Sequence, residues 1–215
     1  MTEAPSERTR VKRLNKRAKY DAETIHGILD AMPICSVGYV FKGTPYVTPT
    51  LQWREADHIY WHGSSASRML ETCIDADVCV TVTMIDGMVM ARAAFHHSCN
   101  YRSVMVMGKA RIIKDPAEKE HRLKAFTEKL FPGRWDILRP VTAQELKATM
   151  MLSLSLDEAS AKVRNGPPGD DEEDYALPIW AGLIPVHTEI LAPTPDARNL
   201  PGLKPPAHVT GFKMG

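Results

Sequence analysis

The segment from Val78 to Met84 reads Val-Cys-Val-Thr-Val-Thr-Met, and its β-branched residues predict a strand. Asp86-Gly87 follows and predicts a turn that returns the chain through residues 88–95. Residues 101–113 predict a long third strand that completes an antiparallel meander. Because antiparallel strands joined in this way need no crossover helices, we expect a mainly β fold.

Shorter strands are predicted on both sides of this meander. Residues 34–41 and 45–53 are separated by the turn Lys42-Gly43-Thr44. Pro45 and Pro49 place the second of these strands at an edge, at a bulge or beside a ligand, because proline cannot donate to a sheet ladder. Later strands are predicted at 58–61, at 151–156, which should bury one face, and at 179–186, which should return to the core. About six strands with few long helices favour an antiparallel barrel with helices at its ends.

Two helices have well-defined starts in the sequence. Asp21 can cap a helix whose apolar residues keep helical spacing as far as Pro33. Asp115-Pro116 with Glu118 combines a capping carboxylate, a proline in the first turn and an acidic residue near the positive helix end. A further short helix is predicted near residues 143–149. These helices should flank the barrel.

Composition narrows the class of protein. The chain has 215 residues, 44% of them hydrophobic, which is enough for a buried core. Its net charge of +1 gives no general attraction to nucleic acid, and its apolar runs are far shorter than a membrane span. The first residues do not resemble a secretory signal, and the four cysteines form no Cys-x-x-Cys pair. We therefore expect a cytoplasmic protein with free thiols and no membrane or nucleic-acid partner.

Charge and composition divide the chain into three parts. Residues 1–20 form a basic arm, which is a solvated tail, a segment that wraps a partner subunit or a phosphate or, as the least favoured alternative, a nucleic-acid-binding segment. Residues 21–191 form the main domain, with an exposed acidic loop over 170–174. Residues 192–215 are rich in proline and glycine and should be extended or lie over a neighbouring chain.

Two separated polar segments suit a phosphate. Residues 62–68 read His-Gly-Ser-Ser-Ala-Ser-Arg, so a strand breaks into a Gly/Ser turn ahead of a helix. Residues 100–103 read Asn-Tyr-Arg-Ser at the start of an alternating strand. Guanidinium and hydroxyl groups are the donors that a phosphate monoester requires. On residue types alone, a helix cap and a solvated arginine explain the same segments.

Other cofactor and metal motifs are missing from the sequence. His96 and His97 are neighbours in the chain, so they point to opposite faces of a strand and cannot easily share one ion with Cys99. No Gly-x-Gly-x-x-Gly, P-loop or Gly-x-Ser-x-Gly sequence occurs. We therefore expect no metal site, no Rossmann domain and no serine-hydrolase elbow.

The order of several motifs resembles the flavin mononucleotide (FMN)-binding split barrels related to pyridoxamine 5'-phosphate oxidase, in the branch that includes nitroimidazole-resistance reductases. The similarity extends from about Lys12 to Val186. The segments that carry it are Gly43–Thr50, Ile59–Ser64 with Ser67-Arg68, His97–Val104 with Gly108–Ala110, Asp115–Lys119 and Pro178–Pro185.

This resemblance implies a mainly β, antiparallel split barrel with flanking helices, which forms a homodimer with FMN at the subunit interface. The backbone of Thr48, Pro49, Thr50 and Leu51 would follow the isoalloxazine ring. The phosphate segment would comprise His62, Gly63, Ser64, Ser67, Arg68 and Met69. Asn100, Tyr101, Arg102 and Ser103 would complete the phosphate and ribityl contacts, from the same subunit or from its partner. Trp180 would cover the ring or belong to the core.

The resemblance also separates possible activities. The oxidase proper has a basic residue where Thr48 stands and a terminal Arg-x-His element that this chain lacks, so oxidation of pyridoxamine phosphate is not expected. The leading hypothesis is an FMN-dependent oxidoreductase that uses a reduced nicotinamide to reduce a small electrophile such as a nitro compound or quinone. His62 would donate a proton, or would be only a hydrogen-bonded residue at the strand end. The alternatives are a flavin-binding, flavin-storing or sensor protein without turnover, and a split barrel that uses a deazaflavin or haem.

Overall fold

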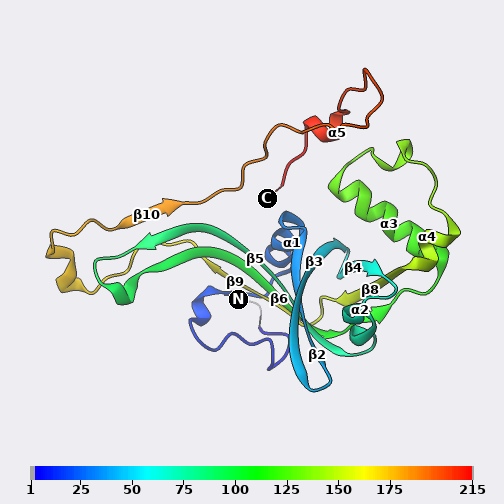
Figure 1. Ribbon diagram of the computed structural model, residues 1–215. Coiled ribbons are helices and arrows are strands. Elements are labelled where there is room, and N and C mark those ends of the chain that lie inside the picture. The colour runs from blue at the N-terminus through cyan, green and yellow to red at the C-terminus, as the bar shows by residue number, and fades with distance from the viewer. Residues whose placement is uncertain (1–2, 215) are drawn as a thin grey trace.

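A computed structural model describes residues 3–214 and shows one antiparallel sheet rolled into a split barrel with helices around it (Figure 1). The strand order is β1-β9-β6-β5-β2-β3-β4-β8-β7, with β10 on the outer part of β5. The strands are β1 (Ala18–Lys19), β2 (Ile34–Phe41), β3 (Thr44–Glu55), β4 (His58–Ser64), β5 (Asp77–Met90), β6 (Ser98–Lys109), β7 (Arg111–Ile112), β8 (Thr149–Ser155), β9 (Ala159–Arg164) and β10 (Gly182–Pro185). The α-helices are α1 (Ala22–Ala31), α2 (Arg68–Cys73), α3 (Pro116–Leu130), α4 (Ala143–Ala148) and α5 (Ala207–Thr210).

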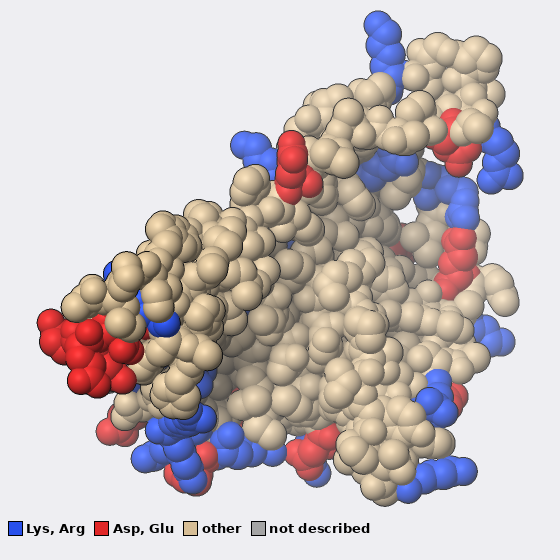
Figure 2. Space-filling model, turned by 60° about the vertical axis from the view of Figure 1, so that its left-hand side comes forward, with Lys and Arg blue, Asp and Glu red and all other residues tan. Residues whose placement is uncertain are grey.

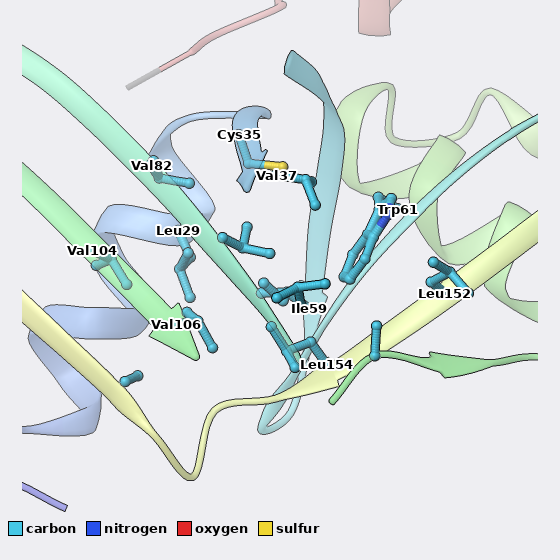
Figure 3. Packing of buried hydrophobic residues seen from close by; sticks show 14 of the residues in the cluster. Leu29, Cys35, Val37, Ile59, Trp61, Val82, Val104, Val106, Leu152 and Leu154 are labelled. Carbon is cyan, nitrogen blue, oxygen red and sulfur yellow. The ribbon is translucent and has the colours of Figure 1, made fainter. Parts of the chain in front are cut away.

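The main core fills the barrel. Side chains from β5 and β6 meet those of β2, β4 and β8 there, and α1 closes one end (Figure 3). The side chains drawn and labelled are Leu29, Cys35, Val37, Ile59, Trp61, Val82, Val104, Val106, Leu152 and Leu154, all at most 2% exposed. A smaller cluster of Trp53, Tyr60 and Met151 lies on the other face of the sheet, where Leu123 and Phe126 of α3 cover it.

Local capping explains why the helices begin where the sequence predicts. The carboxylate of Asp21 accepts a hydrogen bond from the Thr24 amide at 2.8 Å, and α1 starts at the next residue. Asp115 likewise accepts from the Glu118 amide at 3.0 Å, with Pro116 in the first turn of α3. Both predicted starts are confirmed.

The predicted turn at Asp86-Gly87 is wrong. β5 runs through these residues and pairs with β6 along its length, with only a register shift between Ile85 and Gly87. The Asp86 carboxylate is held by Arg102 of β6. Because that partner stabilises a bulge in place of a turn, β5 and β6 continue past the barrel as a long arm, and β10 joins its outer part (Figure 1).

Two expectations about later strands are also corrected. The segment 179–186 does not return to the core, because only β10 is a strand and it pairs with the outer half of β5 on the arm. β8 buries both of its faces and not only one, since Ser153 is 7% exposed and its apolar neighbours on both sides are also buried. β8 lies between the barrel core and the cluster under α3, so both of its faces are covered.

The described part of the basic arm packs against the barrel. Thr9 is 1% exposed, and Arg8 binds Glu158 and, at 3.3 Å, Asp77. β1 pairs with β9, which makes this segment the outermost strand of the sheet. The reading of the arm as a free solvated tail is therefore not supported for residues 3–20.

The C-terminal segment leaves the arm at β10, crosses above α1 and reaches the neighbourhood of α3 (Figure 1). Phe212 lies 5.6 Å from the ring of Phe131, which follows α3. Acidic side chains gather at the outer end of the arm (Figure 2), where the sequence has the acidic run 170–174. Asp170 of this run is not exposed as expected, because its side chain is 0% exposed against Arg92. No helix among residues 3–214 has the length and hydropathy that crossing a bilayer requires.

Candidate functional site

The inner part of β3 has one edge without a partner strand. β3 pairs with β2 over residues 44–51 but with β4 only over residues 52–55. Alternate residues of an antiparallel strand point their N–H and C=O groups away from the paired neighbour. Pro45 and Pro49 share one alternation, and proline is tolerated where its missing N–H faces an open edge. The backbone of Val47 and Leu51, in the same alternation, is therefore available to a ligand.

Arg68 lies next to this edge, on two aromatic rings of the β2–β3 hairpin. Its guanidinium carbon is 4.9 Å from the centroid of Tyr46 and 5.1 Å from that of Phe41. These distances are those of cation–π contacts, which orient the guanidinium without neutralising its charge. No ion pair of Arg68 occurs among residues 3–214. The group can therefore accept an anionic ligand.

The predicted Gly/Ser turn lies between β4 and α2 and presents Arg68. The Ser64 hydroxyl accepts a hydrogen bond from the Ala66 amide at 3.2 Å, and Ser67 caps the Leu70 amide at 3.5 Å. A Cβ atom at Gly63 would stand 3.2 Å from a methyl group of Leu70, so the backbone passes close to the helix there. Met69 is buried and belongs to the core.

The second polar segment is engaged with its own chain. The Asn100 side-chain oxygen accepts hydrogen bonds from Arg164 and from the Gly166 amide, which fixes the end of β9. The Ser103 hydroxyl donates to the Lys162 carbonyl at 3.3 Å. Arg102 donates to both oxygens of Asp86 at 2.8–3.2 Å, and this pair raises the pKa of Arg102. Tyr101, between them, is partly exposed.

Arg68 and Arg102 do not meet within one chain. The rings under Arg68 belong to the hairpin end of β2, whereas Arg102 pairs with Met84, beyond the opposite end of β2. At about 3.3 Å per residue, the seven steps from Ile34 to Phe41 alone span roughly 23 Å. Convergence of the two arginines on one phosphate would require the partner subunit, so it stays a prediction.

His62 points away from Arg68, into the cluster under α3. Its ring lies 5.7 Å from Trp53 and 4.9 Å from Phe126, and its buried Nδ1 has no hydrogen-bond partner among the described residues. Burial lowers the pKa of His62. The imidazole is therefore neutral near pH 7, and the structural reading of this residue fits its position better than a proton-donating role.

Trp180 precedes β10, beside the arm that β5 and β6 form, and it is 66% exposed. The prediction of a core tryptophan is therefore wrong for the single chain. Its ring packs over Gly182, where an added Cβ would stand 2.9 Å from two ring carbons. The alternative prediction, that Trp180 covers a cofactor, would need the arm to reach a second subunit.

Several residues of the site escaped the sequence analysis. Tyr46 and Phe41 support Arg68, and Asp86 occupies Arg102, but nothing in their local sequence indicates these partners. Gln52 donates from Nε2 to the carbonyls of Leu29 and Met32, at 2.7 Å each, and so holds the junction of α1 and β2. Of these residues, only Gln52 stands out in the sequence, because it is a polar residue between two apolar ones on a strand.

The thiols are free, and burial makes two of them poor nucleophiles near pH 7. All four cysteines are free, and burial raises the pKa of Cys35 to about 12 and that of Cys73 to about 11. Among the residues that the structure describes, no cluster of three or more His, Cys, Asp or Glu side chains could hold a metal ion.

Comparison with known proteins assigns the chain to a family. Residues 21–163 match the family described as pyridoxamine 5'-phosphate oxidase, which is two thirds of the chain. The chain belongs to the pyridoxamine 5'-phosphate oxidase family. Membership concerns fold and ancestry, and the family is flavin-binding. A search of curated proteins finds no match.

Three solved structures are similar to this chain. The flavocytochrome Anf3 from Azotobacter vinelandii is 52% identical, with all of both chains covered and a TM-score of 0.97. The FAD and haem binding protein from Mycobacterium smegmatis is 34% identical over 92% of this chain and 98% of that one, with a TM-score of 0.88. A proposed 5-nitroimidazole antibiotic resistance protein from Bacteroides thetaiotaomicron is 23% identical over 68% of this chain and 86% of that one, with a TM-score of 0.55, and shares the fold.

The residues present fit a flavin of this family. The phosphate requires a cation that is not already neutralised, and Arg68 supplies one. The isoalloxazine ring has a polar edge with donors and acceptors, and the open edge of β3 supplies complementary backbone groups. Both features lie at the hairpin end of the barrel, where Val47 is 70% exposed.

Proposed function

We propose that this protein is a flavin-dependent oxidoreductase that holds its flavin between the open edge of β3 and Arg68. The observation that carries the proposal is the position of Arg68, which two rings orient beside an unpaired strand edge and which no described carboxylate neutralises. Family membership supports the same conclusion independently. The site would lie in a homodimer, as the resemblance implies.

A bound flavin would supply the redox chemistry, taking electrons from a reduced donor and passing them to an acceptor. The chain would bind and orient it. Arg68 would hold the phosphate through charge-assisted hydrogen bonds, and the hydroxyls of Ser64 and Ser67 lie on the same turn. The backbone of residues 47–51 would fix the position of the ring edge. No described side chain beside this edge is an evident proton donor, so protons would come from water.

A second cofactor, haem, is part of the proposal. Its support is that a relative 52% identical over the whole chain is described as a flavocytochrome, and one 34% identical as an FAD and haem binding protein. A bound haem would supply one-electron chemistry beside that of the flavin. The acceptor would then be a small oxidant, such as the nitro compounds or quinones expected from the resemblance, with a reduced nicotinamide as electron donor.

The nature of the flavin is the finer part of the proposal. The resemblance implies FMN, whereas the Mycobacterium smegmatis relative is described as binding FAD. Arg68 would bind the first phosphate of either molecule. Mass spectrometry of the cofactor released by denaturation distinguishes FMN, FAD and deazaflavin directly.

The test is to purify the protein and record its absorption spectrum before and after addition of flavin and hemin. A flavin band, bleached anaerobically by reduced nicotinamide and restored by a quinone or nitro compound, is the expected result. A protein that stays colourless and binds no added flavin would contradict the proposal. Bound flavin without turnover by any of a panel of donors and acceptors would favour a storage or sensor role.

A further inference from the structure

A cleft of about 450 Å³ lies on the side of the barrel away from the β2–β3 turn. Its walls come from the end of α1, the outer half of β5 and the C-terminal segment that crosses above them (Figure 1). The residues that line it are Ala31, Met32, Thr83, Met84, Ile85, Asp86, Arg102, Val186, His187, Thr188 and Met214. Cofactor sites range from roughly 300 to 1,000 Å³, so the cleft has the size of such a site.

His187 enters this cleft from the C-terminal segment. The preceding residue, Val186, donates its amide to the Asp86 carbonyl at 3.1 Å, which fixes the segment against β5. The imidazole of His187 makes no hydrogen bond or ion pair within residues 3–214. Histidine is the commonest protein ligand of haem iron, and it binds through a ring nitrogen that has no other partner. His187 offers such a nitrogen on the wall of the cleft.

The rest of the lining suits a flat, largely apolar macrocycle with acidic substituents. Met32, Met84 and Ile85 supply apolar surface, and methionine adapts well to irregular contacts. Arg102 supplies a donor, although Asp86 already pairs with its charge. Asp86 engages its Nε and Nη2, whereas Nη1 makes no hydrogen bond among the described residues and can receive a carboxylate.

Five other histidines are placed less well for this role. Two of them also line clefts, but His26 pairs with Asp57 at 3.4 Å, and the cleft beside His58 is lined by numerous charged side chains. His96 pairs with Asp171 at 3.4 Å. His62 is enclosed by aromatic rings. His97 is the strongest of these rivals, since the Ala93 carbonyl binds its Nδ1 at 3.0 Å and leaves Nε2 free, but it does not line this cleft.

We propose that His187 is a haem ligand and that the cleft between α1, β5 and the C-terminal segment is the haem site. The inference rests on the proposed function, and it names the site for the second cofactor. Met32 lines the cleft, and two residues later Ile34 pairs with Leu51, at the end of the open edge proposed for the flavin.

The experiment is hemin titration of the full-length protein and its His187→Gly variant, followed by the Soret band and by the flavin content. Loss of a hydrogen-bond partner behind a metal ligand weakens metal binding roughly 10–100-fold. Loss of the ligand itself should cost at least as much, so we expect the variant to bind hemin at least about 10–100-fold more weakly than the parent. Added imidazole should restore the Soret band of the variant, because it can occupy the space of the missing side chain. His58→Gly is the matched control and should behave as the parent does.

The outcomes separate the inference from the proposed function. A parent protein that binds flavin but no hemin would overturn the haem part of the proposed function and this inference with it. A parent that binds hemin while His187→Gly keeps an unchanged Soret band, or loss of the band in His97→Gly instead, would overturn only the role of His187. If His187→Gly does not fold, His187→Met serves in its place, with a shifted Soret band as the expected result and an unshifted one as the contrary result.

Discussion

Arg68 stands over Tyr46 with its guanidinium carbon 4.9 Å from the ring centroid, and Phe41 supports the same group at 5.1 Å. The three residues come from the start of α2 and from the two strands of the β2–β3 hairpin. Because the rings hold the guanidinium without neutralising its charge, a phosphate can accept hydrogen bonds from it.

Replacing Arg68 by alanine should weaken flavin binding. A hydrogen bond to a charged group contributes about 1.5–3 kcal/mol, so we expect a roughly 10–100-fold rise in the flavin dissociation constant. Fluorescence titration of the apoprotein with FMN and FAD measures it. Arg111→Ala is the control, because Arg111 is an exposed arginine paired with Asp75 on another part of the surface. Equal affinities of parent and Arg68→Ala would contradict this placement of the phosphate.

Gln52 should stabilise the junction of α1 and β2. Its side-chain amide, 2% exposed, donates to the carbonyls of Leu29 and Met32. In Gln52→Leu both carbonyls lose that donor, although the unpaired Oε1 of Gln52 is removed as well. We therefore expect a loss of about 1–3 kcal/mol in the free energy of unfolding, measured by urea denaturation. Gln144→Leu, at an exposed position of α4, should stay within about 0.5 kcal/mol of the parent.

Burial of His62 predicts a pH dependence of stability. Its pKa in the folded protein is lowered from 6.5, so below that pH the unfolded chain binds a proton that the folded chain does not. Stability should fall as the pH drops from about 6.5 toward the folded pKa. His62→Phe keeps an aromatic ring against Trp53 and Phe126 and should reduce this fall, as measured by urea denaturation between pH 7.5 and 5.5.

The matched control for that experiment is His58→Phe, two residues earlier on β4, where the side chain is exposed. It should leave the pH dependence close to that of the parent. A difference between His62→Phe and the parent that is the same at every pH would show that the imidazole does not titrate on unfolding as argued. Retained redox activity in His62→Phe would agree with a structural role for this residue.

The sequence predicts those parts of the fold that depend on neighbouring residues. The starts of α1 and α3 follow from Asp21 and Asp115, whose bonding partners lie three residues away. Asp86-Gly87 was misread because turn residues and bulge residues have the same composition. The difference lies in Arg102, sixteen residues along the chain, which becomes the partner of Asp86 only once β5 and β6 are paired.

The candidate site divides in the same way. The sequence predicts the turn that presents Arg68, because its glycine and serines lie close together over residues 63–67 and a helix follows them. The rings that support Arg68 are not predicted, because Phe41 and Tyr46 reach it only through the register of the hairpin. His187 had no sequence signal at all. Its interest comes from the path of the C-terminal segment over β5, which proline and glycine content alone cannot specify.

The homodimer predicted from the resemblance should depend on the exposed apolar residues of the β2–β3 hairpin. Val40, Val47 and Leu51 of the paired strands β2 and β3 are 60%, 70% and 39% exposed, and a patch of exposed apolar side chains is expected in contact with a second subunit. Val47→Lys should convert the dimer to a monomer in light scattering and lower flavin retention, because a charge would be buried there. Ile137→Lys, at a comparably exposed position (62%) after α3, should change neither property. A monomeric parent would contradict the predicted homodimer, and a Val47→Lys protein that stays dimeric with its flavin would place the interface elsewhere.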